Sequence, residues 1–253
     1  MSRVVEVSGS GPDLVLLHGW GMNGAAWDPL LPLLESRFRV TRLELPGHGE
    51  SPWDDEGGDL ARWAEAALAA APPQAAWLGW SLGGLVMQRA AVLAPERVSA
   101  LVGVATTPCF VRREGWETAM TPESLAQFGE ALETDLEGTI RRFLALQFHG
   151  VEDGRALQRE LGTALAQRPR PVPEALRAGL SLLLESDLRE PLAGIDRPRL
   201  WILGGRDRLV PPGLGSALPP GVQVRLLERA GHAPFLSHPE AVAVAMTEFL
   251  GHG

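Results

Sequence analysis

The stretch that decides the fold is "AAWLGWSLGGL", residues 75–85. An apolar run of strand length ends in "GWSLG" (79–83), and an apolar segment of helix length follows. A serine bracketed by glycines between a predicted strand and a predicted helix has the G-x-S-x-G pattern of a nucleophile elbow. Glycines are needed because the turn is too tight for a Cβ, and the turn holds the hydroxyl at a helix N-terminus. The pattern predicts that Ser81 is a nucleophile, with a chance glycine-rich turn as the alternative.

Strand-length runs rich in Val, Leu and Ile alternate with helical segments on both sides of this turn. The strand candidates are 14–19, 38–47, 75–79, 98–105, 198–205 and 222–227, and the helix candidates are 24–35, 59–70, 82–94, 212–218 and 239–250. Several strand candidates are almost wholly apolar, which is typical of strands buried on both faces. The alternation predicts a mostly parallel sheet flanked by helices.

The alternation stops between about residues 110 and 190, where the sequence indicates several helices in succession. The clearest of them is "TPESLAQFGEALETDLEGTIRRFLALQF" (121–148). This interruption predicts an inserted helical cap over 110–190. The α/β core then comprises 1–109 and 191–253.

Composition limits the partners and the compartment. The chain has 253 residues, of which 45% are hydrophobic, and a formal charge of −8, which disfavours nucleic acid and anionic membranes. Cys109 is the only cysteine, so no intrachain disulfide forms. The sequence shows neither an apolar signal segment nor a membrane-length apolar run. We expect a cytoplasmic monomer, and without metal-ligand clusters or nucleotide-binding glycine motifs we expect no metal or cofactor.

A nucleophilic serine needs a histidine base, which in an elbow of this kind follows the serine in the chain. His232 lies in "RAGHAPFLSHP" (229–239), a loop between a strand and the last helix, where such sites are built. His238 is the competitor, with helix capping as its alternative role. The other histidines precede the serine, lie in the cap or lie at the chain end: His18, His48, His149 and His252. We predict that His232 is the base.

The acid that orients the base is predicted to be Asp207. It follows the strand candidate 198–205 and precedes His232 by 25 residues. A turn or N-cap role is the alternative for such an aspartate. Asp196 precedes the strand and would lie at the wrong end of the sheet, and Glu228 adjoins the histidine loop directly.

Two backbone N–H groups are needed to stabilise the oxyanion of an acyl-transfer intermediate. Leu82, the residue after the nucleophile, is predicted to supply one. Trp20 follows "LVLLHG" (14–19) and is predicted to supply the other, while its ring walls the pocket. His18 is expected to bond loop backbone rather than to take part in the chemistry.

With these residues assembled, the chain resembles the α/β-hydrolase superfamily. More narrowly, it resembles the pimeloyl-acyl carrier protein methyl ester esterases of biotin synthesis. The matching segments are "LLHGWGMN" (16–23), "WLGWSLGGLV" (77–86), "TPCF" (107–110), "RFLALQ" (142–147) and "AGHAPFLSHP" (230–239). The resemblance covers nearly the whole chain, the predicted cap included.

The resemblance implies hydrolysis of the methyl ester of pimeloyl-acyl carrier protein, with the carrier protein as partner. It implies that the ester lies near Trp20, Ser81, Leu82 and His232 and that the acyl chain passes the segment from Phe143 to Gln147. An apolar tunnel lined by aromatic side chains agrees with this, although each of them also suits ordinary packing.

The resemblance also implies that cap arginines hold the carrier. Residues 141–170 contain six arginines against three acids. Arg142, Arg155 and Arg159 are the candidates, and the last two share a helix face because they are four residues apart. Gly138 stands where the family has an arginine, and Arg141 is a possible substitute. A solvated charged face is the alternative.

Other functions use the same catalytic residues. A general short-chain carboxylesterase would lack only carrier recognition. A cofactor-free haloperoxidase or a carbon–carbon bond hydrolase would differ in its products. A non-catalytic receptor on this fold would not need Ser81, Asp207 and His232 together.

Overall fold

The structure, a computed structural model, describes residues 4–54 and 58–251. Within these ranges seven strands form one sheet in the order β1-β3-β2-β4-β5-β6-β7. They are β1 (Val4–Gly9), β2 (Asp13–Leu17), β3 (Arg39–Leu43), β4 (Ala75–Trp80), β5 (Val98–Val104), β6 (Arg199–Gly204) and β7 (Val222–Leu227). The pairing of β1 with β3 is antiparallel and the other pairings are parallel, which confirms the predicted fold class.

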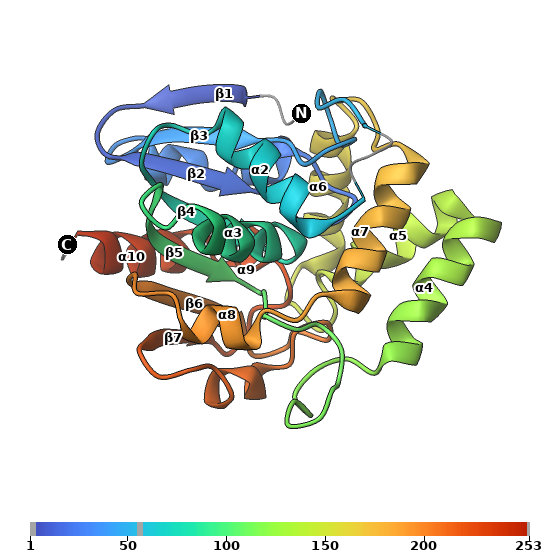
Figure 1. The fold of residues 1–253 in the computed structure, drawn as a ribbon. Helices are drawn as coiled ribbons and strands as arrows, with labels where there is room; N and C mark the ends of the chain where they lie inside the picture. The colour runs from blue at the N-terminus through green and yellow to red at the C-terminus, as the bar shows by residue number, and fades with distance from the viewer. Residues whose placement is uncertain (1–3, 55–57, 252–253) are drawn as a thin grey trace.

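Helices cover both faces of the sheet (Figure 1). On one face α2 (Leu60–Ala70) packs against α3 (Leu82–Leu93), with α8 (Arg189–Ala193) beside α3. On the other face α1 (Leu31–Leu34) packs against α10 (Pro239–Leu250), which follows the short α9 (Pro234–Ser237). In the described part of the chain no helix is both long and apolar enough to cross a membrane.

The predicted helix over 24–35 is wrong. The structure has a 3-10 helix, η1 (Gly24–Trp27), and then the single turn of α1. Pro29 and Pro32 explain the break, because proline has no N–H to donate to the preceding turn and its ring clashes there. A 3-10 helix, η2 (Pro212–Ser216), also stands in place of the predicted helix over 212–218. The edge strand β1 was not predicted.

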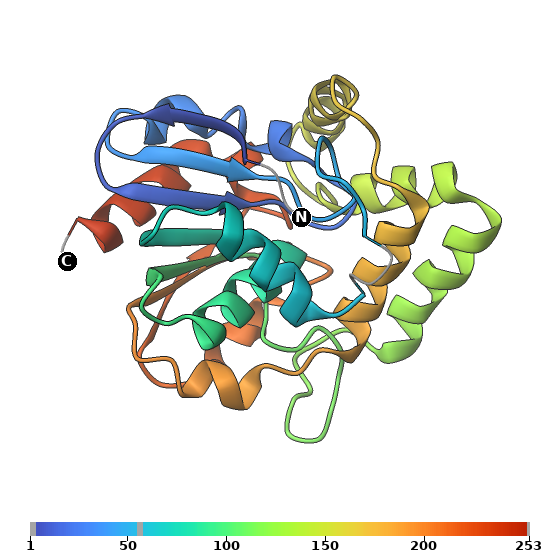
Figure 2. The ribbon, with the colours of Figure 1, turned by 45° about the horizontal axis from the view of Figure 1, so that its top comes forward.

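Four helices lie between β5 and α8: α4 (Pro122–Thr134), α5 (Leu136–Leu146), α6 (Gly154–Leu165) and α7 (Pro173–Glu185). We call them the cap, and they stand at the carboxyl ends of the parallel strands (Figures 1 and 2). The boundaries at 110 and 190 stay a prediction. The predicted helical segment 121–148 is divided at Asp135, which ends α4 and caps α5 by accepting the Gly138 N–H at 2.8 Å.

Candidate active site

The turn at Ser81 is strained, and its neighbours explain why glycine is required there. Ser81 has a φ of 53° and stands immediately before α3, with 3% of its surface exposed. A Cβ on Gly79 would lie 2.6 Å from the Gly84 Cα. A Cβ on Gly83 would lie 2.4 Å from the Leu17 carbonyl oxygen. A positive φ at a non-glycine residue costs free energy. The close packing around Gly79 and Gly83 offsets this cost and holds Ser81 in the elbow.

Backbone hydrogen bonds fix the strained turn. The Ser81 N–H donates to the Val104 carbonyl at 3.1 Å, and the Ser81 carbonyl accepts the Thr106 hydroxyl at 2.7 Å. Both partners belong to the end of β5 or the residues just after it. The nucleophile candidate is thus held by the neighbouring strand as well as by its own turn.

The structure brings Asp207 and His232 together. Asp207 Oδ2 lies 2.8 Å from His232 Nδ1, and both side chains are buried. The other carboxylate oxygen of Asp207, Oδ1, accepts the N–H groups of Leu209 and Val210 at 2.8 and 3.0 Å. Since the carboxylate accepts a hydrogen bond from Nδ1, the proton of the neutral ring lies on Nδ1. His232 Nε2 is left as an acceptor, as a general base requires.

His232 Nε2 has no hydrogen-bond partner within residues 4–54 and 58–251, although it is buried. The backbone around it is well held. Its carbonyl accepts the Trp80 indole N–H at 2.8 Å, and its N–H donates to the Gln147 carbonyl at 3.0 Å. A buried, unpaired and oriented nitrogen is ready to accept a proton from a nucleophile or from water.

The predicted oxyanion donors belong to backbone beside the nucleophile. A Cβ placed on Gly19 would lie 3.3 Å from the Ser81 Cβ, so the loop before Trp20 lies against the serine. Leu82 is the first residue of α3, and N–H groups in the first turn of a helix have no intrahelical acceptor. Donation by Trp20 and Leu82 stays a prediction.

Two buried histidines hold this loop, and the sequence analysis predicted this only for His18. The His18 ring donates from Nδ1 to the Gly19 carbonyl at 2.8 Å and accepts the Leu45 N–H at 3.1 Å. His48 donates to the Pro46 carbonyl at 2.9 Å and accepts the Gly21 N–H at 3.3 Å. Burial, and then the nearby His18, lower the pKa of His48 to about 3. The feature of the sequence that could have indicated this role for His48 is its position between two glycines in "PGHGES" (46–51).

The cap lies directly over these loops. The Phe143 ring stands edge-on to the Trp20 ring, with centroids 4.7 Å apart, and Phe128 lies 6.0 Å from Phe143. The Trp20 indole donates to the Leu176 carbonyl of α7 at 2.8 Å. Gln147 is fully buried beside the histidine loop, and its Oε1 has no partner among the described residues. The structure therefore brings Phe143 and Gln147 to the candidate site.

The three predicted carrier-binding arginines line two different hollows. Arg142 is ion-paired with Asp135 at 3.3 Å and lines an apolar groove of about 430 Å³ between α4 and α5. Arg155 and Arg159 lie on α6 and line a different hollow of about 660 Å³. Carrier binding by these arginines stays a prediction.

The competing candidates lie apart from the pair formed by Asp207 and His232. Asp196 is exposed before β6, at the opposite end of the strand, and Glu228 is exposed. The His238 ring contacts the Ser237 hydroxyl at 2.8 Å, and His149 is exposed on the cap. His252 lies outside the described residues. Within those residues no cluster of His, Cys, Asp and Glu could hold a metal ion.

A mostly parallel sheet with a nucleophile elbow after β4 and an aspartate–histidine pair after β6 and β7 defines an α/β hydrolase. Residues 14–245 match the family described as the alpha/beta hydrolase family, and the chain belongs to it. Within it, the chain belongs to the family of pimeloyl-acyl carrier protein methyl ester esterases. Such an esterase from Aeromonas hydrophila is 46% identical over 256 residues, covering 99% of this chain and 100% of the relative. One from Methylococcus capsulatus is 43% identical and covers 99% of each chain.

Solved structures share the fold. An esterase from Exiguobacterium antarcticum superposes with a TM-score of 0.88 at 22% identity, covering 98% of each chain. A hydrolase from Pseudomonas aeruginosa has a TM-score of 0.80 at 28% identity, covering 97% of this chain and 93% of its own. At this level of identity the first likeness concerns architecture alone.

Proposed function

We propose that this protein hydrolyses the methyl ester of pimeloyl-acyl carrier protein to pimeloyl-acyl carrier protein and methanol, in biotin synthesis. The observation that carries the proposal is the buried His232 Nε2, which has no hydrogen-bond partner among the described residues and is oriented by Asp207 at the carboxyl end of the sheet. Full-length identity of 43–46% to esterases of that name supports the choice of substrate.

In the proposed reaction Ser81 Oγ attacks the ester carbonyl carbon while His232 Nε2 takes the hydroxyl proton. The N–H groups of Trp20 and Leu82 stabilise the tetrahedral oxyanion. The intermediate collapses to an acyl-serine, and His232 returns the proton to the departing methoxide, which leaves as methanol. A water then attacks the acyl-serine with the same base, which releases the pimeloyl carboxylate and restores Ser81.

An aromatic row supports an apolar path for the acyl chain. Phe128 lines the groove between α4 and α5 and contacts Phe143. Phe143 in turn contacts Trp20, next to the nucleophile loop. A methylene chain that passes along these rings loses its contact with water, which favours binding. Gln147 Oε1 offers a buried hydrogen-bond acceptor close to the histidine loop.

The test is methanol release from methyl pimeloyl-acyl carrier protein, with Ser81→Ala as the inactive control. A free dimethyl ester of pimelate is assayed in parallel, and the ratio of the two kcat/KM values measures carrier recognition. A large preference for the carrier-linked ester supports the proposal. Equal turnover of both esters would identify a general short-chain carboxylesterase, and absence of turnover with an intact fold would refute both.

We also propose that the protein works as a monomer in the cytoplasm. The single cysteine, Cys109, is buried and unbridged, which suits a reducing compartment. Sedimentation at micromolar concentration tests the oligomeric state.

A further inference from the structure

The segment "GWSLGG" (79–84) holds one glycine more than the nucleophile elbow itself requires. Gly84 lies in the first turn of α3, and a Cβ placed on it would stand 2.2 Å from Thr106 Oγ1 and 2.5 Å from Thr106 Cβ. A Cβ on Gly103 in β5 would likewise lie 2.8 Å from Thr106 Cγ2. Both glycines therefore leave room for one side chain, that of Thr106, which is fully buried just after β5.

The Thr106 hydroxyl bonds the nucleophile turn. It donates to the Ser81 carbonyl at 2.7 Å, and the direction is fixed because a carbonyl oxygen can only accept. The same carbonyl accepts the Gly84 N–H at 2.9 Å. One backbone oxygen in the strained turn thus receives two donors, one from its own helix and one from the segment that follows the adjacent strand.

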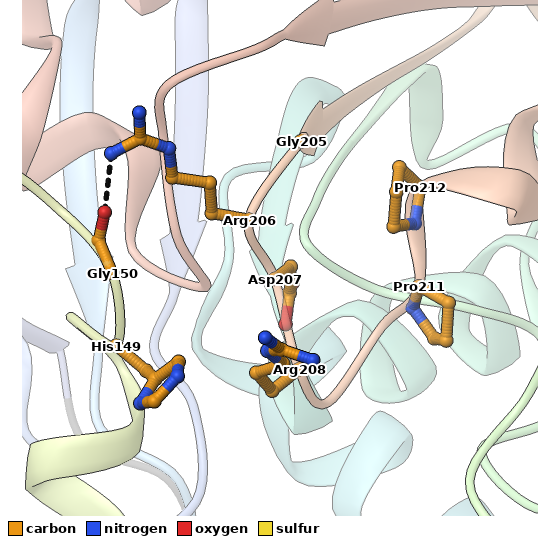
Figure 3. A pocket seen from close by; sticks show the side chains of 8 residues that line it. All are labelled: His149, Gly150, Gly205, Arg206, Asp207, Arg208, Pro211 and Pro212. Carbon is orange, nitrogen blue, oxygen red and sulfur yellow. Dashed lines mark hydrogen bonds between the residues drawn. The ribbon is translucent and has the colours of Figure 1, made fainter.

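Thr106 is itself held by the next strand of the sheet. Its carbonyl accepts the indole N–H of Trp201, a buried residue of β6, at 3.0 Å. The preceding residue, Ala105, has a φ of 44°, and its N–H donates to a carbonyl of β6 at 2.9 Å. β6 then continues into the loop that bears Asp207, shown from close by in Figure 3. The strand that leads to the candidate acid therefore also positions Thr106.

The Ser81 carbonyl and the Leu82 N–H belong to the same peptide unit. Such a unit is planar, and in its trans form the C=O and the N–H point in opposite directions. Two donors that fix the carbonyl therefore also fix the direction of the N–H. Leu82 is the first residue of α3, so its N–H has no acceptor inside the helix and is available to a substrate.

We infer that Thr106 is a positioning residue, whose hydroxyl holds the peptide between Ser81 and Leu82 in the orientation in which the Leu82 N–H stabilises the oxyanion. The inference rests on the proposed function and on the donor role predicted for Leu82. A hydrogen bond to the carbonyl also polarises the amide, which makes its N–H a stronger donor. The effect is greater on the transition state than on the bound substrate, because the oxyanion forms only when Ser81 attacks.

The experiment removes the Thr106 hydroxyl and then restores it. Thr106→Val deletes the hydroxyl and keeps the branched shape, whereas Thr106→Ser keeps the hydroxyl without the methyl group. Thr107→Val is the matched control, because Thr107 is the neighbouring buried threonine and its hydroxyl donates to the Cys109 carbonyl at 2.9 Å instead.

Two quantities are measured on each variant of the full-length protein. The first is turnover of the free dimethyl ester of pimelate, resolved into kcat and KM. The second is the affinity for an alkyl boronic acid, measured by calorimetry. The boronic acid adds to Ser81 Oγ as a tetrahedral anion, so its affinity reports on the oxyanion donors without any turnover.

We expect Thr106→Val to lower kcat about 10- to 100-fold while KM changes less than about twofold, because a misdirected oxyanion donor costs less than the roughly 10²- to 10³-fold of a missing one. Affinity for the boronic acid should fall by the same factor. Thr106→Ser and Thr107→Val should both keep kcat within about threefold of the wild type. Thermal melts of the two valine variants should fall alike, by about 2–4 °C, since each loses one buried hydrogen bond.

Should Thr106→Val fail to fold, Thr106→Ala deletes the hydroxyl without placing a methyl group against the Ser81 carbonyl, and it should show the same loss of kcat. A kcat within about threefold of the wild type would overturn the inference, since the Gly84 N–H alone would then orient the carbonyl. An equal loss in Thr107→Val, or no recovery in Thr106→Ser, would show that the segment contributes packing only.

A loss of kcat with unchanged affinity for the boronic acid would also overturn the inference, because the effect would then lie elsewhere than at the oxyanion. The proposed function fails separately, if the wild-type enzyme does not turn over the carrier-linked ester. The free ester and the boronic acid decide the role of Thr106 in either case.

Discussion

The loops around Ser81 and the cap that covers them hold their side chains by different means. In the core loops, backbone N–H and C=O groups bond the functional residues, as at Asp207 and at Ser81. In the cap, ion pairs between half-exposed side chains predominate, such as that of Arg177 with Glu133. Backbone contacts that are buried fix a geometry, whereas exposed pairs contribute little and exchange readily. The core is thus suited to constant chemistry and the cap to adaptable recognition.

Several polar contacts join the two regions, and one of them centres on a buried carboxylate. Glu44, at the end of β3, is fully buried and accepts the Gly24 N–H at 3.1 Å. Its Oε1 lies 3.5 Å from Nη1 of Arg168, which follows α6 in the cap. Nearby, the Asn23 side chain donates to the Leu165 carbonyl at the end of α6 at 3.0 Å. The cap is therefore anchored through polar groups of the core and not only by apolar packing.

The largest effect is expected in the core. Ser81→Ala should lower kcat by about 10⁶-fold without changing the melting temperature by more than a few degrees, because a proposed triad acts as a unit. His232→Ala should cost about as much, and Asp207→Asn about 10⁴-fold. Turnover assays and thermal melts decide the matter, and a fully active Ser81→Ala protein would rule out the mechanism.

A glycine in each region tests the contrast in backbone packing. Gly83→Ala in the elbow should lower stability by about 3 kcal/mol or more and abolish activity, because its Cβ would meet buried backbone at 2.4 Å. Gly129→Ala on α4 meets nothing within 4 Å and should raise stability by about 0.5–1 kcal/mol. Urea unfolding measures both, and equal tolerance at the two positions would contradict the contrast.

The next largest effect on stability is expected at the contact between Glu44 of the core and Arg168 of the cap. Arg168→Met should lower the free energy of unfolding by about 2 kcal/mol, because the buried Glu44 carboxylate loses its ion pair with the cap and keeps only the nearby Arg42 as a cation. Arg177→Met removes a half-exposed pair and should cost under about 1 kcal/mol. Chemical denaturation with limited proteolysis near α6 compares the two variants. Equal losses would mean that Glu44 does not anchor the cap.

Stability should fall in acid because of His48. Its folded pKa of about 3 lies below the ~6.5 of an unfolded histidine. Above pH 6.5 the ring is neutral in both states, but as pH falls toward 3 the unfolded chain gains a proton that the folded protein refuses. This costs stability at up to about 1.4 kcal/mol per pH unit, or about 2 kcal/mol at pH 5. His48→Asn should flatten this part of the pH profile, and an unchanged slope would assign it to other groups.

The smallest expected effect is on KM, and it distinguishes Arg142 from Arg155 and Arg159. Arg142→Ala should raise KM for the carrier-linked ester under about threefold, because its guanidinium already pairs with Asp135. Replacing Arg155 and Arg159 together with Ala should raise KM for the carrier-linked ester about 5- to 30-fold. Steady-state kinetics with the free ester as reference measures the difference. If Arg142→Ala has the larger effect, the carrier lies over the groove between α4 and α5 instead.

Local patterns predicted most of the sheet and the main candidate residues. The elbow pattern marked Ser81, because only glycine fits where backbone approaches at 2.4–2.6 Å. Chain order and position after strands then selected Asp207 and His232, which the structure places in hydrogen-bond contact. Pro29 and Pro32 are a sequence signal for the break in the helix predicted over 24–35, but the prediction did not use them. The edge strand β1 depends on its pairing with β3, which residues 4–9 alone do not reveal.

The sequence by itself determined the order of strands and helices, the elbow and the types of residue that follow the strands, because these depend on neighbours in the chain. Only the tertiary structure decided which charged groups are free. Arg168 finds Glu44 and Arg170 finds Glu137 across elements, while Arg155, Arg159 and Arg208 find no partner within the described residues. It also decided that His48 holds the loop of Trp20. Such pairings depend on how distant segments pack, and the spacing of residues along the chain carries no record of that packing.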